Sequence, residues 1–516
     1  MTFLPKADPR TFECPSRDWA QVRNRDRQHG WHQLLRGYAL LMVMACSALP
    51  ARPQTAPAGS PRTFTSGNLS AIQVGPGSPV SGSVPSGTAT SEVLRLTLRD
   101  AIARAVRYNL GAIETGENAR SARGEKLLAL SGLLPQVSAG VSENVAQVSL
   151  TPTGIGRVVN IPGVSFPRVI GPFSYSEAGG NLAWTLFSYE SIQRFRAART
   201  AEEAAQLNYN DTLDVVTLTV GSAYLQVIAT NSRITAQQAQ VRNAQATYDQ
   251  ALRKNQAGTA PRIDVTNTQV QLRTEQYNLS VARNNFQIAK LNLSRAIGLP
   301  LGQAFELADS LPYGDINPPT VEEALRMALA TRSDFLAARA AQTAAERSLS
   351  AAKAQRYPVV ATQGNYTVVG PTFGRSHGSF DFQAGISVPI FTGGQIKGDI
   401  TQAEAALRQR SSEAENVRGQ IDYDVRTAFF NLNAATEQVG VARENVELAT
   451  ESLSRSKDRF AAGVADSVEV VQAEQSLASA NDQYISALYS HNLAKLSLAR
   501  AIGVARTNYS QYLGGK

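Results

Sequence analysis

The chain has 516 residues, of which 43% are hydrophobic and 18% are charged, and its mean hydropathy is -0.20. This composition excludes a polytopic helical membrane protein, because the longest apolar run, Gly37 to Leu49, is shorter than the roughly 20 residues that a spanning helix needs. A transmembrane β-barrel remains possible, since its strands alternate lipid-facing and lumen-facing residues and average to a soluble hydropathy.

The charge and the titratable side chains give no sign of a nucleic-acid partner, a metal site or a catalytic centre. The net charge is +8, and it falls to about +5 without the first 45 residues, which hold seven basic and four acidic side chains. No run of Lys and Arg is interleaved with aromatic residues, so we expect no nucleic acid as a partner. The four histidines lack metal-ligand spacing, and no phosphate-binding loop is present. We therefore expect no cofactor, no metal and no enzymatic activity.

Residues 1–49 are predicted to be a signal peptide, because a positive flank precedes a thirteen-residue apolar stretch that ends in small residues. Two processing routes remain open. One is cleavage after Ala48, and the other is lipidation of Cys46, since the sequence Val-Met-Ala-Cys resembles a bacterial lipoprotein box. Residues 50–92 are rich in Pro, Gly, Ser and Thr and are predicted to be a disordered linker.

An internal repeat divides the rest of the chain into two halves. The segment Ala289–Gly298 (AKLNLSRAIG) recurs as Ala494–Gly503 (AKLSLARAIG), at a shift of 205 residues. Segments nearer the start of each half recur at a shift of 223. A repeat of this length exceeds the periods of solenoid proteins and predicts two structurally equivalent halves. The halves are residues 93–310 and 311–504, and a C-terminal tail follows at 505–516.

Each half is predicted to end in two long helices joined by a short reversal. The helices are expected at about 188–256 and 262–298 in the first half and at about 393–461 and 466–503 in the second. A heptad-like apolar seam from Ala403 to Phe460 requires helical partners along its length. The glycines at the two reversals, Gly258 and Gly463, suit the position that ends a helix.

Two strand-like patches precede the long helices of each half. They cover about 135–150 and 174–187 in the first half and about 357–370 and 379–391 in the second. Their period-two alternation predicts barrel strands with apolar side chains outward, and a soluble sheet is the alternative. Four strands cannot close a barrel, and an open edge cannot face lipid. Strands that span a membrane would therefore require two chains, with eight strands, or three chains, with twelve.

Together these features resemble the TolC family of outer-membrane efflux proteins. The resemblance rests on the signal peptide, the duplicated halves, a strand pair before a very long helix, the reversal pattern A-G-x(5)-[DE]-V and the closing K-L-x-L-x-R-A-I-G. It covers Leu94 to about Val504. It implies a fold that is mostly α with β: long α-helical coiled-coil hairpins and four membrane β-strands per chain, internally duplicated. Three chains would form a homotrimer with a twelve-stranded β-barrel and an α-helical periplasmic tunnel.

The same resemblance implies partners and a topology. The partners would be a periplasmic adaptor (membrane fusion) protein, an inner-membrane pump and the lipid of the outer membrane of a Gram-negative bacterium. The strand loops at 151–172 and 371–378 would face outside the cell, and the reversals near Gly258 and Gly463 would form the periplasmic tip.

The resemblance also implies a gate at that tip. Matching the reversal pattern puts Glu469 at the first position of an acidic ring and Gln472 where a second acid would stand. Asp264 matches an aspartate in the family's closing contacts, but Phe460 occupies the position of its tyrosine partner. Closure would then depend on packing or on other polar residues such as Asp466. For Asp264 and Glu469 the alternative is an ordinary acid that complements a helix N-terminus.

These features predict a passive exit duct, the outer-membrane channel of a tripartite efflux or type I secretion system, for which the pump supplies the energy. The main alternative is a periplasmic coiled-coil scaffold or adaptor without a pore. The two strand pairs at the repeat spacing favour the channel, because an adaptor carries a compact β-domain at one end of a single helical hairpin.

Overall fold

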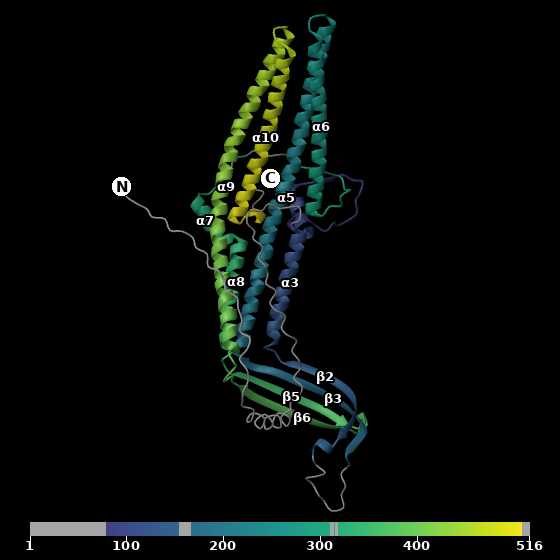
Figure 1. Cartoon of the computed structure of the whole chain (residues 1–516), viewed down its shortest axis with the longest axis vertical. Helices are drawn as coiled ribbons and strands as arrows, with labels where there is room; N and C mark the ends of the chain where they lie inside the picture. Colours follow the sequence, from purple (N-terminus) through teal and green to yellow (C-terminus); the bar gives the residue numbers. More distant parts are fainter. Residues whose placement is uncertain (1–78, 154–166, 310–313, 315–317, 508–516) are drawn as a thin grey trace, which may run out of the picture. The chain divides into compact units, whose positions relative to one another are not determined.

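The computed structural model describes residues 79–153, 167–309, 314 and 318–507. Within them the chain is mostly helical, with one four-stranded antiparallel sheet at one end of the helices (Figure 1). The predicted signal peptide, Cys46, most of the predicted linker and most of the C-terminal tail lie outside the described residues, as does the middle of the predicted loop at 151–172.

Four long helices form two hairpins. The first hairpin is α5 (Tyr189–Gln256) with α6 (Arg262–Ile297), and the second is α9 (Gln395–Ala461) with α10 (Ser467–Ile502). Every one of these bounds lies within two residues of the sequence prediction. Four shorter helices had no predicted bounds of their own. They are α2 (Leu98–Tyr108), α3 (Leu110–Ser131), α7 (Val321–Thr331) and α8 (Ser333–Ala354).

The short helices follow the internal repeat closely. Both α2 and α7 begin with a capping box, in which Thr97 and Asp100 exchange hydrogen bonds in the first half and Thr320 and Glu323 do so in the second. Each box satisfies backbone N–H groups that the first turn of a helix leaves without an intrahelical partner. The two boxes are separated by the same 223 residues as the sequence repeat, so the repeated sequence encodes a repeated helix start.

The two halves pack differently around their long helices. Helix α5 contacts α3, α6, α8 and α10, so it has neighbours on several sides over much of its length. Helix α9 packs against α7, α8 and α10. Along the hairpins the order of neighbours is therefore α6, α5, α10, α9, and α6 and α9 lie at opposite edges of this layer (Figure 1).

The four strands of the two halves form a single sheet in the order β2 (Gln136–Ser149), β3 (Val169–Ser188), β5 (Val359–Gly370) and β6 (His377–Ser387). Pairing between β3 and β5 joins the two halves. Strand β6 was predicted to continue to Phe391 but ends at Ser387, because its neighbour β5 begins at Val359, directly opposite Ser387. A separate parallel pair joins β1 (Leu94–Leu96) to β4 (Phe305–Leu307).

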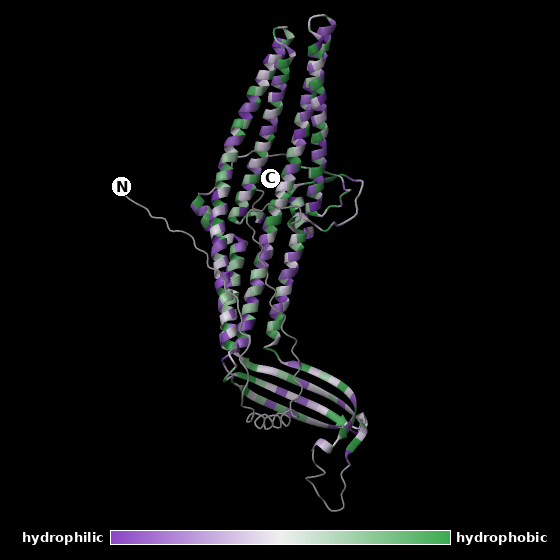
Figure 2. Ribbon diagram, in the orientation of Figure 1, coloured by the Kyte–Doolittle hydropathy of each residue, from purple (hydrophilic) through white to green (hydrophobic). Residues whose placement is uncertain are grey.

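The register gives this sheet one apolar and one polar face, because directly paired residues point to the same side. The alternation along the strands is visible in Figure 2. On one face lie Val137, Val141, Leu182, Trp184, Tyr366, Phe380, Phe382 and Ile386. On the other lie Ser138, Ser142, Asn181, Gln363, Asn365, Asp381 and Gln383. The large apolar side chains of the first face are mostly exposed, with Phe380 at 82% and Ile386 at 71%.

Each half has its own hydrophobic core, where the short helices meet the hairpin. The core of the first half joins α2, α5 and α6, and that of the second half joins α7, α9 and α10. All the seam residues predicted between Ala403 and Phe460 are buried or half-buried, which confirms the seam.

The apolar residues of α5 lie mostly inside the chain. An 18-residue window of this helix is long and apolar enough to cross a membrane by length and composition, and 67% of that window is buried inside the chain. Because Val216, Val220 and Tyr224 of this helix belong to the first core, packing accounts for the apolar composition.

The last part of the predicted linker is bound to the helices. Val84 N donates to Tyr108 O, Ser86 N donates to Gly298 O, and Thr90 N donates to Gln303 Oε1. The prediction of disorder is therefore wrong for residues 79–92, because their backbone groups pair with the ends of α2 and α6. The prediction rested on proline and glycine content, and composition does not indicate whether backbone groups form hydrogen bonds with other parts of the chain.

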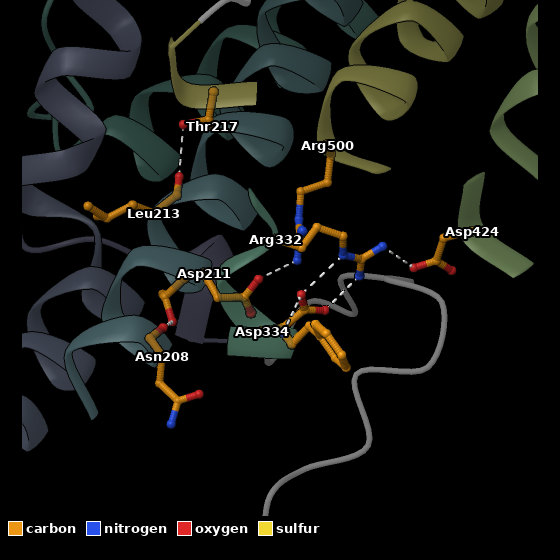
Figure 3. A network of polar contacts seen from close by, with 10 residues as sticks. Asn208, Asp211, Leu213, Thr217, Arg332, Asp334, Asp424 and Arg500 are labelled. Carbon is orange, nitrogen blue, oxygen red and sulfur yellow. Dashed lines mark hydrogen bonds and ion pairs between the residues drawn. The ribbon is translucent and has the colours of Figure 1, made fainter. Parts of the chain in front are cut away.

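An ion network joins the two halves near the corner between α7 and α8 (Figure 3). Arg332, 4% exposed, donates to Asp334 (Nη2 to Oδ2, 2.6 Å) and to Asp424 on α9 (Nη1 to Oδ2, 2.9 Å). Arg500 on α10 pairs with Asp211 on α5. Burial raises the pKa of Asp211 more than Arg500 lowers it. At Asp334 burial acts in the same direction, but the hydrogen bonds and charge of Arg332 outweigh it and hold the pKa below its ordinary value.

Candidate functional site

The two reversals at the far end of the hairpins have the same backbone geometry. Gly258 and Gly463 have φ of +72° and +77°, in the left-handed region that favours glycine. An added Cβ would meet no atom within 4 Å at either position. The backbone conformation, and not a lack of space, is therefore what requires glycine here.

The second reversal is stabilised by its own acidic residues. Asp466 caps α10 by accepting a hydrogen bond from Glu469 N at 3.1 Å. The Glu469 carboxylate accepts from Arg459 Nε, also at 3.1 Å. Asp466 and Glu469, which were predicted, and Arg459 thus contact one another within the second hairpin, and these two hydrogen bonds do not reach the first hairpin. Pro261 occupies the matching cap position in the first half and makes no side-chain cap.

Two contacts cross between the hairpins at the tip. Asp264, 8% exposed, accepts a hydrogen bond from Ser467 Oγ at 2.7 Å. The Lys254 ammonium lies 4.4 Å from the centre of the Phe460 ring and donates to the Phe460 backbone oxygen. The sequence identified Asp264 and Phe460 as gate residues, but their partners here, Ser467 and Lys254, were not identified.

Phe460 also belongs to a small hydrophobic cluster just below the reversals. It is 2% exposed and packs with Ala251 of α5 and with side chains of its own hairpin. Those side chains are Leu453, Val470, Ala473 and Leu477. The phenyl ring therefore buries apolar surface at the position where the family pattern has a tyrosine.

Below this cluster a polar layer joins all four helices. Thr247 Oγ1 on α5 donates to Glu474 Oε1 on α10 at 2.8 Å, and Lys457 Nζ on α9 donates to Asn243 Oδ1 on α5 at 3.2 Å. Gln475 Nε2 donates to Gln271 Oε1 on α6 at 3.3 Å. Gln472, which was predicted for a second gate position, is exposed.

The buried acid of this segment is Glu474, two residues further along α10, at 3% exposure. No feature of the single sequence distinguished it from the surface acids of the same helix. We define the inter-hairpin seam as the cross-hairpin contacts of Lys254, Asp264, Phe460 and Ser467 together with those of the polar layer.

A polar cleft of about 820 Å³ lies further from the tip, between α5, α6 and α10. Arg233 spans it, donating to Asp482 Oδ1 at 3.1 Å and to Ser486 Oγ at 2.9 Å. Among the described residues no group of three or more His, Cys, Asp or Glu side chains is arranged to hold a metal ion. The long helices thus form a wall in which polar side chains make many of the contacts between helices.

Comparison with known proteins agrees with this architecture. The outer membrane efflux protein family matches residues 118–299 and 324–504, one match in each half. The chain is 23% identical to the outer membrane protein TolC of Salmonella enteritidis over 342 residues, which cover 64% of this chain and 69% of that protein. It is also 23% identical to the alkaline protease secretion protein AprF of Pseudomonas aeruginosa, over 63% of this chain and 69% of that protein.

Solved structures show the same fold. The crystal structure of the outer membrane protein VceC from Vibrio cholerae superposes with a TM-score of 0.66 at 18% identity, covering 79% of this chain and 96% of that one. Because the family matches more than half of the residues, the chain belongs to the outer membrane efflux protein family.

The protein is thus an outer-membrane efflux channel of a Gram-negative bacterium and not an enzyme. This decides between the two functions that the sequence allowed. The family match and the relatives favour the channel over a periplasmic scaffold or adaptor. The amphipathic sheet also has the two faces that a membrane-inserted wall requires.

Proposed function

We propose that three copies of this chain form a passive exit duct for a tripartite efflux or type I secretion system. The observation that carries the proposal is the sheet. Its apolar face suits lipid, its polar face suits an aqueous lumen, and both of its edges, β2 and β6, lack a neighbouring strand among the residues that the structure describes. Unpaired backbone groups at a lipid-exposed edge would cost several kcal/mol each. Pairing β6 of one chain with β2 of the next removes every edge.

Three chains would then supply twelve strands, four from each copy. Eight-stranded barrels are filled by side chains, and larger ones leave room for water. Three chains are therefore the smallest number of copies whose barrel can hold an aqueous path. Val388 and Ile390 follow β6 and occupy the alternate positions that would continue its apolar face. They are 51% and 98% exposed. If pairing with the next chain lengthened β6, these two side chains would face lipid.

The helices support the same assembly. The edge helix α6 carries an exposed apolar stripe at near-heptad spacing: Ile263, Val270, Tyr277, Ile288 and Leu291. The opposite edge helix α9 carries another: Tyr423, Phe430, Val441 and Leu448. Exposed stripes of this kind bury well against a second helix and are costly in water. We place α9 of one chain against α6 of the next.

The sequence contains no phosphate-binding loop, so the energy for transport would have to come from a partner. We propose that an inner-membrane pump supplies the energy and that a periplasmic adaptor protein meets the helical tip. Relatives of this chain include proteins named for alkaline protease secretion and for pyoverdine export. We therefore propose that the pump, and not the wall, selects the substrate.

We propose further that the tip is the gate. Glu469 of three chains would stand around the threefold axis and favour cations, while the neutral Gln472 would leave the ring with one acid per chain. The inter-hairpin seam would hold the tip closed, through Asp264 with Ser467 and Lys254 with Phe460.

Outer-membrane fractionation and heat-modifiable migration on gels test the assembly, and planar-bilayer recordings test the pore. We expect a heat-sensitive oligomer in the outer membrane and discrete conductance steps. A chain that stays in the soluble periplasmic fraction would contradict the proposal.

The gate has its own test. Glu469→Ala should weaken cation preference, and Gln472→Glu, which adds a second acid per chain, should strengthen it. If Glu469→Ala leaves both conductance and cation preference unchanged, the assignment of Glu469 is wrong.

A further inference from the structure

A buried carboxyl of α10, Glu474, lies in the polar layer where the two hairpins meet. Glu474 of α10 is 3% exposed. Its Oε1 accepts a hydrogen bond from Thr247 Oγ1 of α5 at 2.8 Å. Its Oε2 is buried and has no hydrogen-bond partner in the described part of the chain. A buried ionised carboxylate would need a hydrogen-bond donor at each oxygen, and in the described part of the chain a donor reaches only Oε1.

The charged groups around Glu474 only partly offset its burial. Lys457 Nζ of α9 lies 4.0 Å from Oε1 and is shared with Asn243 Oδ1 of α5. From α6 comes a like charge, Glu275, whose own carboxylate accepts hydrogen bonds from Gln237 and Gln271. From α5 come the neutral Asn243 and Thr247. The site thus offers one shared cation against one neighbouring acid.

These surroundings favour the neutral form of the side chain. Burial raises the pKa of Glu474, and the Thr247 hydrogen bond and the Lys457 charge lower it only in part, while Glu275 raises it further. Separation of the hairpins would return Glu474 to water, where a carboxyl has its ordinary pKa.

We propose that Glu474 is a proton-sensitive contact that sets how readily the two hairpins separate: in its neutral form it holds α10 against α5, and in its ionised form it favours the separated, open tip. The inference rests on the proposed function, since it assigns a regulator to the same tip. It differs from the acidic ring, because Glu474 lies inside the wall between α5 and α10 and not at the exposed entrance.

The direction of the pH effect follows from linkage. A carboxyl whose pKa is higher in the closed state stabilises that state fully at pH below its ordinary pKa. The stabilisation is lost as the pH rises through the raised closed-state value. Opening should therefore increase with pH and then level off. Each unit of pKa difference between closed and open states changes the equilibrium by about tenfold per chain.

Single-channel recording of the full trimer in planar bilayers from about pH 5 to about pH 8 tests this. We expect the open probability of the wild type to rise with pH, and that of Glu474→Gln to stay flat at the low-pH level of the wild type. Glu444→Gln, which changes an exposed acid of α9 that makes no ion pair among the described residues, should keep the wild-type profile. Glu469→Gln should change ion preference and keep the pH dependence.

Two further variants separate this effect from a merely loosened tip. Thr247→Val removes the hydrogen-bond donor and Lys457→Met removes the cation, so each should move the midpoint to higher pH and keep the tip closed over a wider range. A loosened tip would instead open at every pH.

A pH profile that persists in Glu474→Gln, or one that disappears in Glu469→Gln, would overturn the proposal. Conductance without any pH dependence would do the same while leaving the channel assignment intact. Absence of conductance from every variant and from the wild type would overturn the proposed duct itself, so the two failures are distinguishable.

Discussion

Helices α5 and α9 are two copies of one long helix, and the chain uses them differently. Leu225 of α5 is 2% exposed, whereas Phe430, at the equivalent position 205 residues later, is 72% exposed. Leu218 of α5 is half-buried, and its equivalent Tyr423 is 63% exposed. In α5 these apolar positions meet neighbouring helices of the same chain, and in α9 they remain open at the edge of the layer.

The polar positions differ in the opposite sense. Asp211 and Asp214 of α5 are buried at 5% exposure each, near Arg500, and their equivalents in α9 are the exposed Asn416 and Gly419. The two copies of the helix therefore differ in which of their equivalent positions are buried. The interior copy has two buried acids near Arg500 of the other half, and Asp211 pairs with it, whereas the edge copy carries an exposed apolar face.

The largest expected effect comes from Arg332, whose buried guanidinium binds Asp334 of α8 and Asp424 of α9. Arg332→Ala would leave Asp334 and Asp424 without their buried cation, and breaking a buried pair in this way costs about 3 to 5 kcal/mol. Thermal or denaturant unfolding of the purified protein measures the loss. Arg120→Ala, at a pair with 79% and 60% exposed side chains, should be nearly neutral. Equal effects of the two variants would contradict the role given to Arg332.

The matched pair Leu225→Ala and Phe430→Ala tests the comparison directly. Leu225→Ala should destabilise the fold by about 2 to 5 kcal/mol, because it leaves a cavity against Leu496. Phe430→Ala should change the stability of the chain itself by no more than about 0.5 kcal/mol but weaken the trimer by about 2 kcal/mol.

Unfolding curves and the temperature at which the oligomer dissociates on gels separate these two effects. If Phe430→Ala leaves the oligomer as heat-resistant as the wild type, α9 does not form the interface.

Asp214 gives a pH-dependent prediction. Burial raises its pKa to about 6, with Arg500 and Arg506 lowering it only in part. Because the folded-state pKa lies above the ordinary value, stability is greatest at low pH and falls as the pH rises to about 6. Asp214→Asn should therefore stabilise the protein at about pH 8 by at most about 3 kcal/mol and change little at about pH 4. Glu437→Gln, at an exposed site of α9, serves as the control for unfolding measured at both pH values.

The smallest effects are expected where the two copies agree. Gly258→Ala and Gly463→Ala place a side chain at φ of +72° and +77° with no steric contact, so each should cost about 1 kcal/mol. Gly298→Ala should cost more, because its Cβ would lie 2.7 Å from Tyr108 Cβ and 2.9 Å from Val84 O. Unfolding free energies of the three variants check this order, and a tip variant that costs as much as Gly298→Ala would refute it.

Much of the tip followed from the sequence and some of it did not. The reversals at Gly258 and Gly463 and the acids Asp264 and Glu469 belong to a pattern that repeats at 205 residues. Phe460 and Asp466 were named as gate candidates from the resemblance to the family. Ser467, which binds Asp264, and the Thr247 to Glu474 contact were not predicted. The helices carry many acidic residues, and a single sequence does not indicate which of them is buried.

The sequence by itself determined the duplication, the lengths of the long helices, the seam of α9 and the alternation of the strands, because each is a local periodicity set by which side chains share a face. Only the tertiary structure decided that the two strand pairs form one sheet through β3 and β5, that α5 is interior and α9 is at the edge, and which acids are buried. Those outcomes depend on which elements come together across some 200 residues of chain, and the periodicity of an amphipathic element specifies that it needs a partner without specifying which one.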